Sequence, residues 1–237
     1  MERFLALLDD LRRLHKHLDL AQALPQTLAL VQKAIPTEAA ALALLDPDAG
    51  DLVIQAATGP GIDRVVGMRF SPTTGLTGQS VLTGRPMLVR SPQNAPHFHA
   101  HVDSRPDLSL RELLCIPLRD AQERLGVIQL MNKVDGSFDD DDVKLLRRLA
   151  AEIAIVIQNA HRYEKERRRR RVADALLAVS SAQATAADLE TLLTIILEQL
   201  GRVIPYVSAA IFQVDEDSQV RVLAQRGFPR PGMAEQA

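Results

Sequence analysis

The sequence predicts an α+β fold in which short strands and flanking helices enclose a pocket beneath a long loop. Strands are predicted where short apolar runs are bounded by turn residues, at 39–45, 52–57, 113–118 and 126–131. The loop is predicted from the Gly- and Pro-rich stretch between Ser71 and Pro106, because loops of this length are uncommon unless they cover a site. Helical periodicity before and after these segments completes the pattern of an α+β module.

The chain is expected to begin with two helices and a hairpin. A coiled-coil-like helix over residues 1–17 is predicted from apolar residues spaced alternately by three and four: Phe4, Leu7, Leu11, Leu14 and Leu18. The segment from Asp19 to Ile35 continues helically, with Leu24, Leu28 and Val31 on one face. The strands at 39–45 and 52–57 are separated by turn residues, which predicts a hairpin.

A long helix is predicted from Asp139 onward. It carries a second seam of the same spacing, formed by Leu146, Leu149, Ile153, Val156, Ala160 and Tyr163. We therefore expect a homodimer through the helices Phe4–Leu18 and Leu146–Tyr163. Residues 164–185 are expected to form a linker helix. Its arginine run, Arg167–Arg171, is preceded at helical spacing by glutamates, which favours a solvated helix over a nucleic-acid or membrane site.

An internal repeat indicates a second module. The segment from Asp19 to Asp46 aligns without a gap with the segment from Asp188 to Asp215, and the next strand aligns after one residue is dropped from the turn. Residues 186–237 therefore correspond to the first helix and hairpin of residues 18–163. Because half a module leaves sheet edges uncovered, we expect that the natural chain continues beyond residue 237.

Composition points to a cytoplasmic protein of one or two domains. The 237 residues are 46% apolar, and the net charge of −2 provides no field that would attract nucleic acid or membrane. The single cysteine, Cys115, cannot form an internal disulfide. The N-terminus lacks the apolar core and cleavage site of a signal peptide, and the most apolar helical stretch, 149–157, is too short to span a bilayer.

Three motifs, in this order and spacing, resemble GAF domains, the small-molecule sensor modules of signalling proteins. They are the glycine-rich segment Gly75–Pro86, the apolar strand Leu113–Leu118, and the strand Gly126–Lys133 followed by Phe138 and an acidic run. The resemblance implies a tandem GAF protein, with one complete domain at 18–163 and the front half of another at 186–237. It also implies an antiparallel sheet with helices on both faces, and a ligand between the sheet and residues 71–109.

The resemblance also implies which residues contact the ligand. Position by position, these are Leu76, Thr77, His99, Leu110 and Gln129. Members that bind cyclic nucleotides carry threonines at the positions of Pro106 and Leu110 and a glutamate at that of Gln129. These departures leave a cyclic nucleotide as only one candidate ligand, because a buried site that lacks hydrogen-bond partners loses roughly 1–3 kcal/mol per unsatisfied group.

A further motif of the cyclic-nucleotide-binding members is matched by Asn132, Lys133, Phe138 and Asp142, which are called here the NKFD motif. The resemblance implies that this motif acts as a lock near the pocket through a Lys–Asp ion pair. The glutamate that ends the motif is replaced by Val143. A simpler interpretation is also open, in which Asp139 caps the following helix and Asp142 completes a capping box.

Catalytic and metal sites are not expected. Cys115 lies in an apolar strand, and the serine and threonine pairs lack a His/Asp pattern that would indicate a nucleophile. No Gly-Lys-Ser/Thr follows the glycines, so a phosphate-binding loop is not predicted. The alternating His97, His99 and His101 could in principle hold a metal, but we expect an ordinary lid segment, with no metal and no cofactor.

The sequence therefore predicts a regulatory segment rather than an enzyme. A small ligand would bind in the GAF pocket, and a dimeric helix would relay the signal to an output domain outside this chain. The alternative is a ligand-free GAF domain that serves for dimerisation and spacing, which the scarcity of aromatic residues and the apolar lid positions favour. A reductase of the GAF-type methionine sulfoxide class is a third hypothesis, against which the lone cysteine argues.

Overall fold

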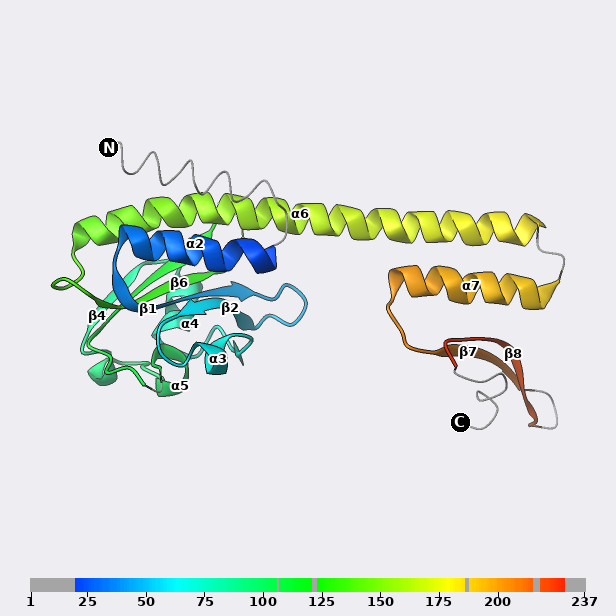
Figure 1. Ribbon diagram of the computed structural model, residues 1–237, viewed down its shortest axis with the longest axis horizontal. Coiled ribbons are helices and arrows are strands. Elements are labelled where there is room, and N and C mark those ends of the chain that lie inside the picture. The colour runs from blue at the N-terminus through cyan, green and yellow to red at the C-terminus, as the bar shows by residue number, and fades with distance from the viewer. Residues whose placement is uncertain (1–19, 106, 121–122, 186–187, 215–217, 229–237) are drawn as a thin grey trace. The chain divides into compact units, whose positions relative to one another are not determined.

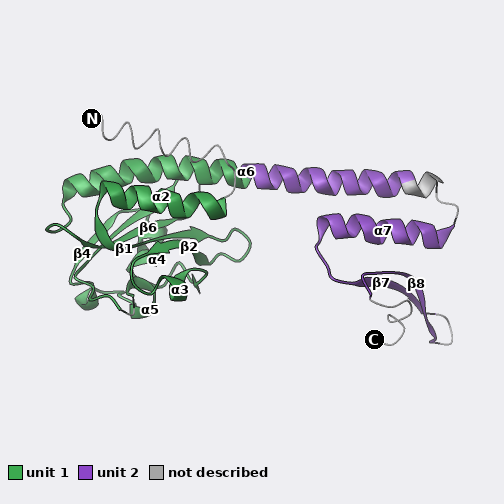
Figure 2. Ribbon diagram, in the orientation of Figure 1, with its two compact units in different colours: residues 1–161 green, residues 162–237 purple. Residues whose placement is uncertain are grey.

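The computed structural model describes residues 20–105, 107–120, 123–185, 188–214 and 218–228 (Figure 1). The chain divides into two compact units, residues 1–161 and 162–237 (Figure 2). The helix predicted over residues 1–17 lies outside the described residues.

Unit 1 is built on a six-stranded antiparallel sheet with the order β3-β2-β1-β6-β5-β4. Its strands are β1 (Thr37–Leu45), β2 (Leu52–Thr58), β3 (Arg69–Phe70), β4 (Met87–Arg90), β5 (Glu112–Arg119) and β6 (Arg124–Lys133). Strand β1 pairs with β6, which joins the first hairpin to the last. The central strands are buried on both faces, which explains why they are continuous apolar runs without alternation. The predicted fold class and its four main strands are confirmed.

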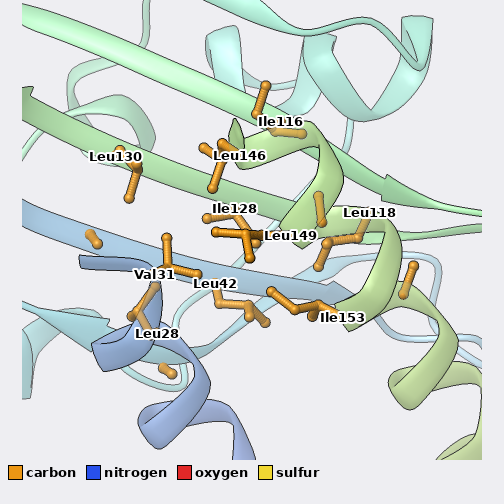
Figure 3. Packing of buried hydrophobic residues seen from close by; sticks show 14 of the residues in the cluster. Leu28, Val31, Leu42, Ile116, Leu118, Ile128, Leu130, Leu146, Leu149 and Ile153 are labelled. Atoms are coloured by element: carbon orange, nitrogen blue, oxygen red, sulfur yellow. The ribbon is translucent and has the colours of Figure 1, made fainter. Parts of the chain in front are cut away.

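Two helices cover one face of this sheet. They are α2 (Leu20–Ala34) and the first half of α6 (Asp140–Thr185), and both lie on the same side of the strands (Figure 1). Leu28 and Val31 of α2 meet Leu42 of β1 and Leu149 of α6 in a core of aliphatic side chains (Figure 3). This helix-covered face is mainly apolar, as the predicted stripe on α2 requires, and the buried hydroxyl of Thr27 donates to the carbonyl of Ala23 in the same helix.

The seam at Leu146–Tyr163 has a different role from the one expected. Leu146, Leu149 and Ile153 are 0%, 0% and 1% exposed, and they pack against the sheet of their own unit. Alternating spacings of three and four place residues on one helix face, and in α6 that face is directed at the domain core. These three residues therefore belong to the domain core, while Tyr163 at the end of the seam is 48% exposed, and dimerisation through this helix stays a prediction. A partner helix would have to contact other side chains, such as Ile155, which is 53% exposed.

The opposite face of the sheet is covered by short elements (Figure 1). These are α3 (Ile62–Val65), α4 (Gly75–Thr83), the 3-10 helix η1 (Pro92–Asn94) and α5 (Ala100–Asp103). The sequence predicted an irregular segment here, whereas the structure forms α4 and β4 within it. Glycine lowers helix propensity, but Gly78 is needed because a Cβ there would lie 2.3 Å from the carbonyl oxygen of Pro72.

Unit 2 contains the second half of α6, then α7 (Leu189–Val203) and the hairpin of β7 (Ala209–Val214) and β8 (Val220–Arg226). Its hairpin shifts register between Ile211 and Phe212, at the position that aligns with the shift between Leu42 and Ala43. Gly227 has a positive φ of 80° and aligns with Gly59, whose φ is 88°. At both glycines a Cβ would collide with the carbonyl oxygen of the aligned residue, Val207 or Glu38.

Among the residues that the structure describes, no helix has both the length and the apolar character needed to cross a membrane.

Candidate functional site

Four polar side chains are buried between the sheet and the short elements on its second face, which we call the lid side. They are Thr77 on α4, Asp103 at the end of α5, Arg105 just after it, and Gln129 on β6, and each is at most 2% exposed. The surrounding side chains are apolar, including Leu76, Val102, Leu110, Leu113 and Met131. Burial of polar groups is unfavourable unless they are hydrogen-bonded, so their partners decide what this cluster can do.

The carboxylate of Asp103 caps helix α4 from a distant part of the chain. Its Oδ2 accepts hydrogen bonds from the backbone N–H of Leu76 at 2.8 Å and of His99 at 2.9 Å. Its Oδ1 accepts from the backbone N–H and the hydroxyl of Thr77, at 2.9 and 2.7 Å. The unpaired N–H groups of a helix N-terminus favour a negative charge, and here the protein supplies it.

Gly75 makes this capping contact possible. It has a φ of 75°, and a Cβ at this position would lie 2.6 Å from Oδ2 and 2.8 Å from Oδ1 of Asp103. The close approach and the positive φ both require glycine. The first glycine of the Gly75–Pro86 motif therefore serves to bring α4 against a carboxylate.

Arg105 has few acceptors for a buried guanidinium. Its Nη1 donates to the carbonyl oxygen of Ser104 at 3.0 Å, and its Nη2 donates to Oε1 of Gln129 at 3.4 Å. Its Nε is buried and has no hydrogen-bond partner among the described residues. Burial lowers the pKa of Arg105 to about 10, although the nearby charge of Asp103 opposes this shift. Arg105 is therefore protonated at neutral pH.

The hydrogen bonds of the cluster have a fixed direction. The Thr77 hydroxyl donates to Asp103 and accepts from Nε2 of Gln129 at 3.0 Å. Because the Gln129 amino group is directed at Thr77, its oxygen faces Arg105. The cluster is thus a chain of donors that begins at Arg105 and ends at Asp103.

The structure brings together four of the five predicted ligand contacts. Leu76, Thr77, Leu110 and Gln129 are buried on the lid side. The fifth, His99, has an exposed side chain, and only its backbone N–H joins the cluster, through Asp103. Asp103 and Arg105 were not predicted, because an acid and a base in a lid segment carry no periodic signal and their partners lie far away in sequence.

Asn132 of the NKFD motif holds the end of β6 to the returning lid segment. Its Oδ1 accepts from the backbone N–H of Arg111 at 2.7 Å and of Glu112 at 3.2 Å. Its amide nitrogen donates to the Ser109 carbonyl at 2.8 Å and to Glu38 at 2.7 Å. The φ of Asn132 is 53°, a conformation that asparagine tolerates better than most residues. The bonds from Asn132 and Arg111 lower the pKa of Glu38.

The other motif residues connect β6 to the start of α6. Lys133 Nζ lies 2.5 Å from Asp142, so the ion pair that the resemblance implied is present. The hydrogen bond to Asp142 raises the pKa of Lys133, which burial opposes. Phe138 is 0% exposed and packs in the helix-covered core. The buried carboxylate of Glu112, which sequence reasoning missed, accepts from the backbone N–H groups of Lys133 and Phe138 at 3.2 and 3.1 Å.

The predicted capping box is also present. Asp139 Oδ1 accepts from the N–H of Asp142 at 2.9 Å, and Asp142 Oδ2 accepts from the N–H of Asp139 at 3.0 Å. The bond from the Asp142 backbone lowers the pKa of Asp139. Asp142 therefore caps α6 and pairs with Lys133 at the same time, so the two interpretations of this acid are compatible.

The structure does not place the cysteine or the lid histidines where they could act as a nucleophile or as metal ligands. The thiol of Cys115 is buried, and burial raises its pKa, so it lacks the thiolate character of a nucleophile. His97, His99 and His101 are exposed. Within the described ranges, no group of three or more His, Cys, Asp or Glu residues is arranged to hold a metal ion.

Comparison with protein families identifies the fold. The model of the GAF domain family matches residues 17–158, which is more than half of the chain. The chain belongs to the GAF family. A solved GAF domain of the phosphoenolpyruvate-protein phosphotransferase of Coxiella burnetii is similar in structure, with a TM-score of 0.60 and 22% identity over 69% of this chain and 98% of that one. The free methionine-R-sulfoxide reductase of Neisseria meningitidis has the same fold, with a TM-score of 0.56, 20% identity, and coverage of 68% and 91%.

Sequence relatives contain the GAF domain within longer chains. The dual 3',5'-cyclic-AMP and -GMP phosphodiesterase 11A of Takifugu rubripes is 29% identical over 110 residues, which are 46% of this chain and 12% of that protein. The Nif-specific regulatory protein of Herbaspirillum seropedicae is 28% identical over 139 residues, 56% of this chain and 25% of that protein. The chain therefore spans a quarter or less of these relatives. Its GAF domain is homologous to domains of phosphodiesterases and of a regulatory protein, which is consistent with a regulatory, ligand-sensing module.

Proposed function

We propose that this chain is a cytoplasmic, non-catalytic sensor whose GAF domain binds a small molecule on the lid side and passes the signal to helix α6. The observation that carries the proposal is the buried cluster of Thr77, Asp103, Arg105 and Gln129 in an otherwise apolar layer. A cluster like this is costly for stability alone, whereas convergent polar groups within apolar walls are typical of ligand sites.

Hydrogen bonds and an ion pair connect the segment that follows this site in the chain to α6. Arg105 precedes the segment 109–112, which Asn132 binds through backbone groups. Glu112 in turn binds the N–H groups of Lys133 and Phe138, and Lys133 pairs with Asp142 in the first turn of α6. A ligand that favours one position of the lid would therefore bias the start of α6, by no more than its difference in affinity for the two states.

We further propose that unit 2 begins a second GAF domain. The support is the shared order of helix and hairpin, the register shift at aligned positions and the aligned glycines Gly59 and Gly227. In this arrangement α6 is the linker helix of a tandem, and it would carry a change in the first domain to the second. The output domain would lie elsewhere in the natural protein.

A second candidate function is a ligand-free module for dimerisation and spacing. The observation that favours it is the exposure of apolar side chains on the second half of α6, where Leu176 and Leu177 are 64% and 67% exposed. Exposed leucines on a helix are a common contact between coiled-coil partners. This function and the sensor function are compatible, because a dimeric helix could transmit the signal.

The test is a thermal-shift screen of the whole chain against cyclic AMP, cyclic GMP and a panel of metabolites. The cyclic nucleotides belong in the panel because a relative's name includes them. A ligand at a hundred times its dissociation constant adds about 2.7 kcal/mol to the free energy of unfolding, or about 5–10 °C in Tm. Hydrogen exchange should then show altered protection in the first turn of α6.

A control variant separates binding from transmission. Lys133→Met should still bind the ligand but should lose the change in exchange at α6, because its ion pair with Asp142 is removed. If a folded chain shows no shift with any compound, and light scattering shows a dimer, the dimerisation module becomes the better explanation.

A further inference from the structure

Arg105 is a buried charged group on the lid side that lacks a charged hydrogen-bond partner among the described residues. It is 2% exposed, and its two hydrogen bonds go to uncharged oxygens, the Ser104 carbonyl and the Gln129 amide. Its Nε has no acceptor among the described residues. Buried arginines are normally paired with a carboxylate or a phosphate, so this guanidinium calls for an explanation.

The nearest acid cannot complete the site. Asp103 lies two residues away, but its two oxygens already accept four hydrogen bonds, from the backbone of Leu76, Thr77 and His99 and from the Thr77 hydroxyl. A carboxylate offers about four lone-pair sites, and these four donors occupy them. Asp103 therefore acts on the charge of Arg105 without a hydrogen bond, and no other described residue gives the guanidinium an anionic acceptor.

The edge of the guanidinium formed by Nε and Nη2 is available to bind a ligand, and its geometry suits two oxygens side by side. Nε and Nη2 carry parallel N–H groups on the same side of the planar fork. Within the described part of the chain, Nε has no acceptor, and the contact of Nη2 is the 3.4 Å bond to Oε1 of Gln129. Charge-assisted bonds to an anionic oxygen are shorter, about 2.7–2.9 Å. A carboxylate or phosphate on this edge would give both N–H groups closer partners than the amide provides.

We propose that the ligand of this GAF domain is a small organic anion, and that its carboxylate or phosphate binds side-on to Nε and Nη2 of Arg105. This inference rests on the proposed sensor function, since it names the chemical class of the molecule sensed. In this binding mode a ligand oxygen takes the place that Oε1 of Gln129 has beside Nη2. The rest of the ligand contacts apolar side chains such as Leu76, Leu110 and Met131, so the molecule carries its charge at one end.

The test measures binding of matched probes to the whole chain by calorimetry at constant ionic strength. Each anion is paired with a neutral analogue: succinate with succinamide, glutarate with glutaramide, and cyclic AMP with adenosine, while inorganic phosphate tests the bare anion. A wider panel of metabolic carboxylates and phosphate esters is screened by thermal shift. We expect anions to bind and their neutral analogues to bind at least tenfold more weakly. If succinate or glutarate binds more tightly than its amide, the site takes carboxylates; if cyclic AMP binds more tightly than adenosine, it takes phosphates.

Variants assign the effect to Arg105. Arg105→Met should abolish anion binding, and Arg105→Lys should weaken it at least tenfold, because an ammonium keeps the charge but loses the planar fork. Arg64→Met on α3 is the matched control, since Arg64 is exposed, and it should bind like the unmodified chain. In the absence of any ligand, Arg105→Met should have an unchanged or higher Tm, whereas a purely structural arginine would give a lower one.

The outcomes separate this inference from the sensor function. Tight binding of a neutral compound, or anion binding that survives Arg105→Met and Arg105→Lys within twofold, would overturn the anion site and leave the sensor function standing. If Arg105→Met does not fold, Arg105→Lys alone decides between these results. A folded chain that binds no compound of either class would overturn the sensor function, and the anion site with it.

Discussion

The two faces of the central sheet are covered in different ways. On one face, α2 and α6 pack aliphatic side chains against β1, β5 and β6 in a mainly apolar core (Figure 3). On the other face, short helices and turns cover a mixed layer in which Thr77, Asp103, Arg105 and Gln129 are buried among apolar residues. The same strands supply both faces, because alternate residues of a strand point to opposite sides.

This difference is consistent with the proposal that the lid side binds a ligand while the helix-covered face provides stability. The helix-covered face buries apolar area, which is the main favourable contribution to folding. The lid side retains a guanidinium whose burial lowers its pKa and which has no anionic partner among the described residues. Such groups persist where binding requires them, often at the expense of stability. Substitutions on the two faces should therefore change the free energy of unfolding by different amounts.

The largest effect is expected for Phe138→Ala. Phe138 belongs to the NKFD motif, yet it is fully buried in the helix-covered core, so its removal should lower the free energy of unfolding by about 3–5 kcal/mol. Urea denaturation followed by circular dichroism measures this loss. Phe138→Leu keeps most of the volume and should lose much less. Equal stability of Phe138→Ala and the unmodified chain would show that this residue does not belong to the core.

A smaller effect, specific to the lid side, is expected for Gly75→Ala. The new Cβ would collide with the carboxylate of Asp103, and the alanine would have to adopt a φ of 75°. We therefore expect the free energy of unfolding to fall by about 2–4 kcal/mol. Gly50→Ala is the matched control, because Gly50 has a φ of 77° with nothing within 4 Å of a Cβ, and it should lose about 1 kcal/mol. The difference between the two variants measures the capping contact. Equal losses would mean that Asp103 moves aside freely.

The smallest effect is expected at Lys133, whose ion pair with Asp142 connects the end of β6 to the first turn of α6. The hydrogen bond to Asp142 raises the pKa of Lys133 above its ordinary value of 10.5. A raised pKa stabilises the folded state below the unfolded pKa, and this stabilisation is lost as the pH rises through the folded pKa. Lys133→Met should therefore cost about 1–2 kcal/mol near pH 8 and progressively less above pH 10.5.

Urea denaturation of Lys133→Met and of the unmodified chain, near pH 8 and again above pH 10.5, checks this prediction. Lys144→Met is the control, because Lys144 forms an ion pair with Asp141 whose side chains are 70% and 90% exposed, and its effect should be smaller. A difference between Lys133→Met and the unmodified chain that stays constant up to pH 11 would argue against the ion pair with Asp142 as its source.

Local patterns accounted for most of the fold. Apolar runs with flanking turns predicted the four main strands, and an acidic start predicted the capping box of Asp139 and Asp142. The short strands β3 and β4 and the glycine-containing helix α4 were missed, since their formation depends on packing rather than on propensity. The burial of Leu146, Leu149 and Ile153 in the core of their own domain was not predicted, because the same spacing serves a core-facing helix and a coiled coil, and the dimer itself stays a prediction.

The candidate site was less accessible from sequence. Leu76, Thr77 and Gln129 were predicted from the resemblance to GAF domains and lie on the lid side. Asp103 binds residues 26 and 27 positions away, and Arg105 contacts a side chain 24 positions away. Pairings over such distances depend on how the lid folds back on the sheet, which no local pattern records.

The capping of α4 by Asp103 has a consequence for the energetics of recognition. Because this carboxylate already ties α5 to α4, the backbone between them loses much of its conformational freedom when the domain folds, before any ligand arrives. Under the proposed function, an incoming molecule would meet a preorganised cover and would not have to supply the free energy of ordering it. A small molecule with few atoms could therefore be retained with useful affinity.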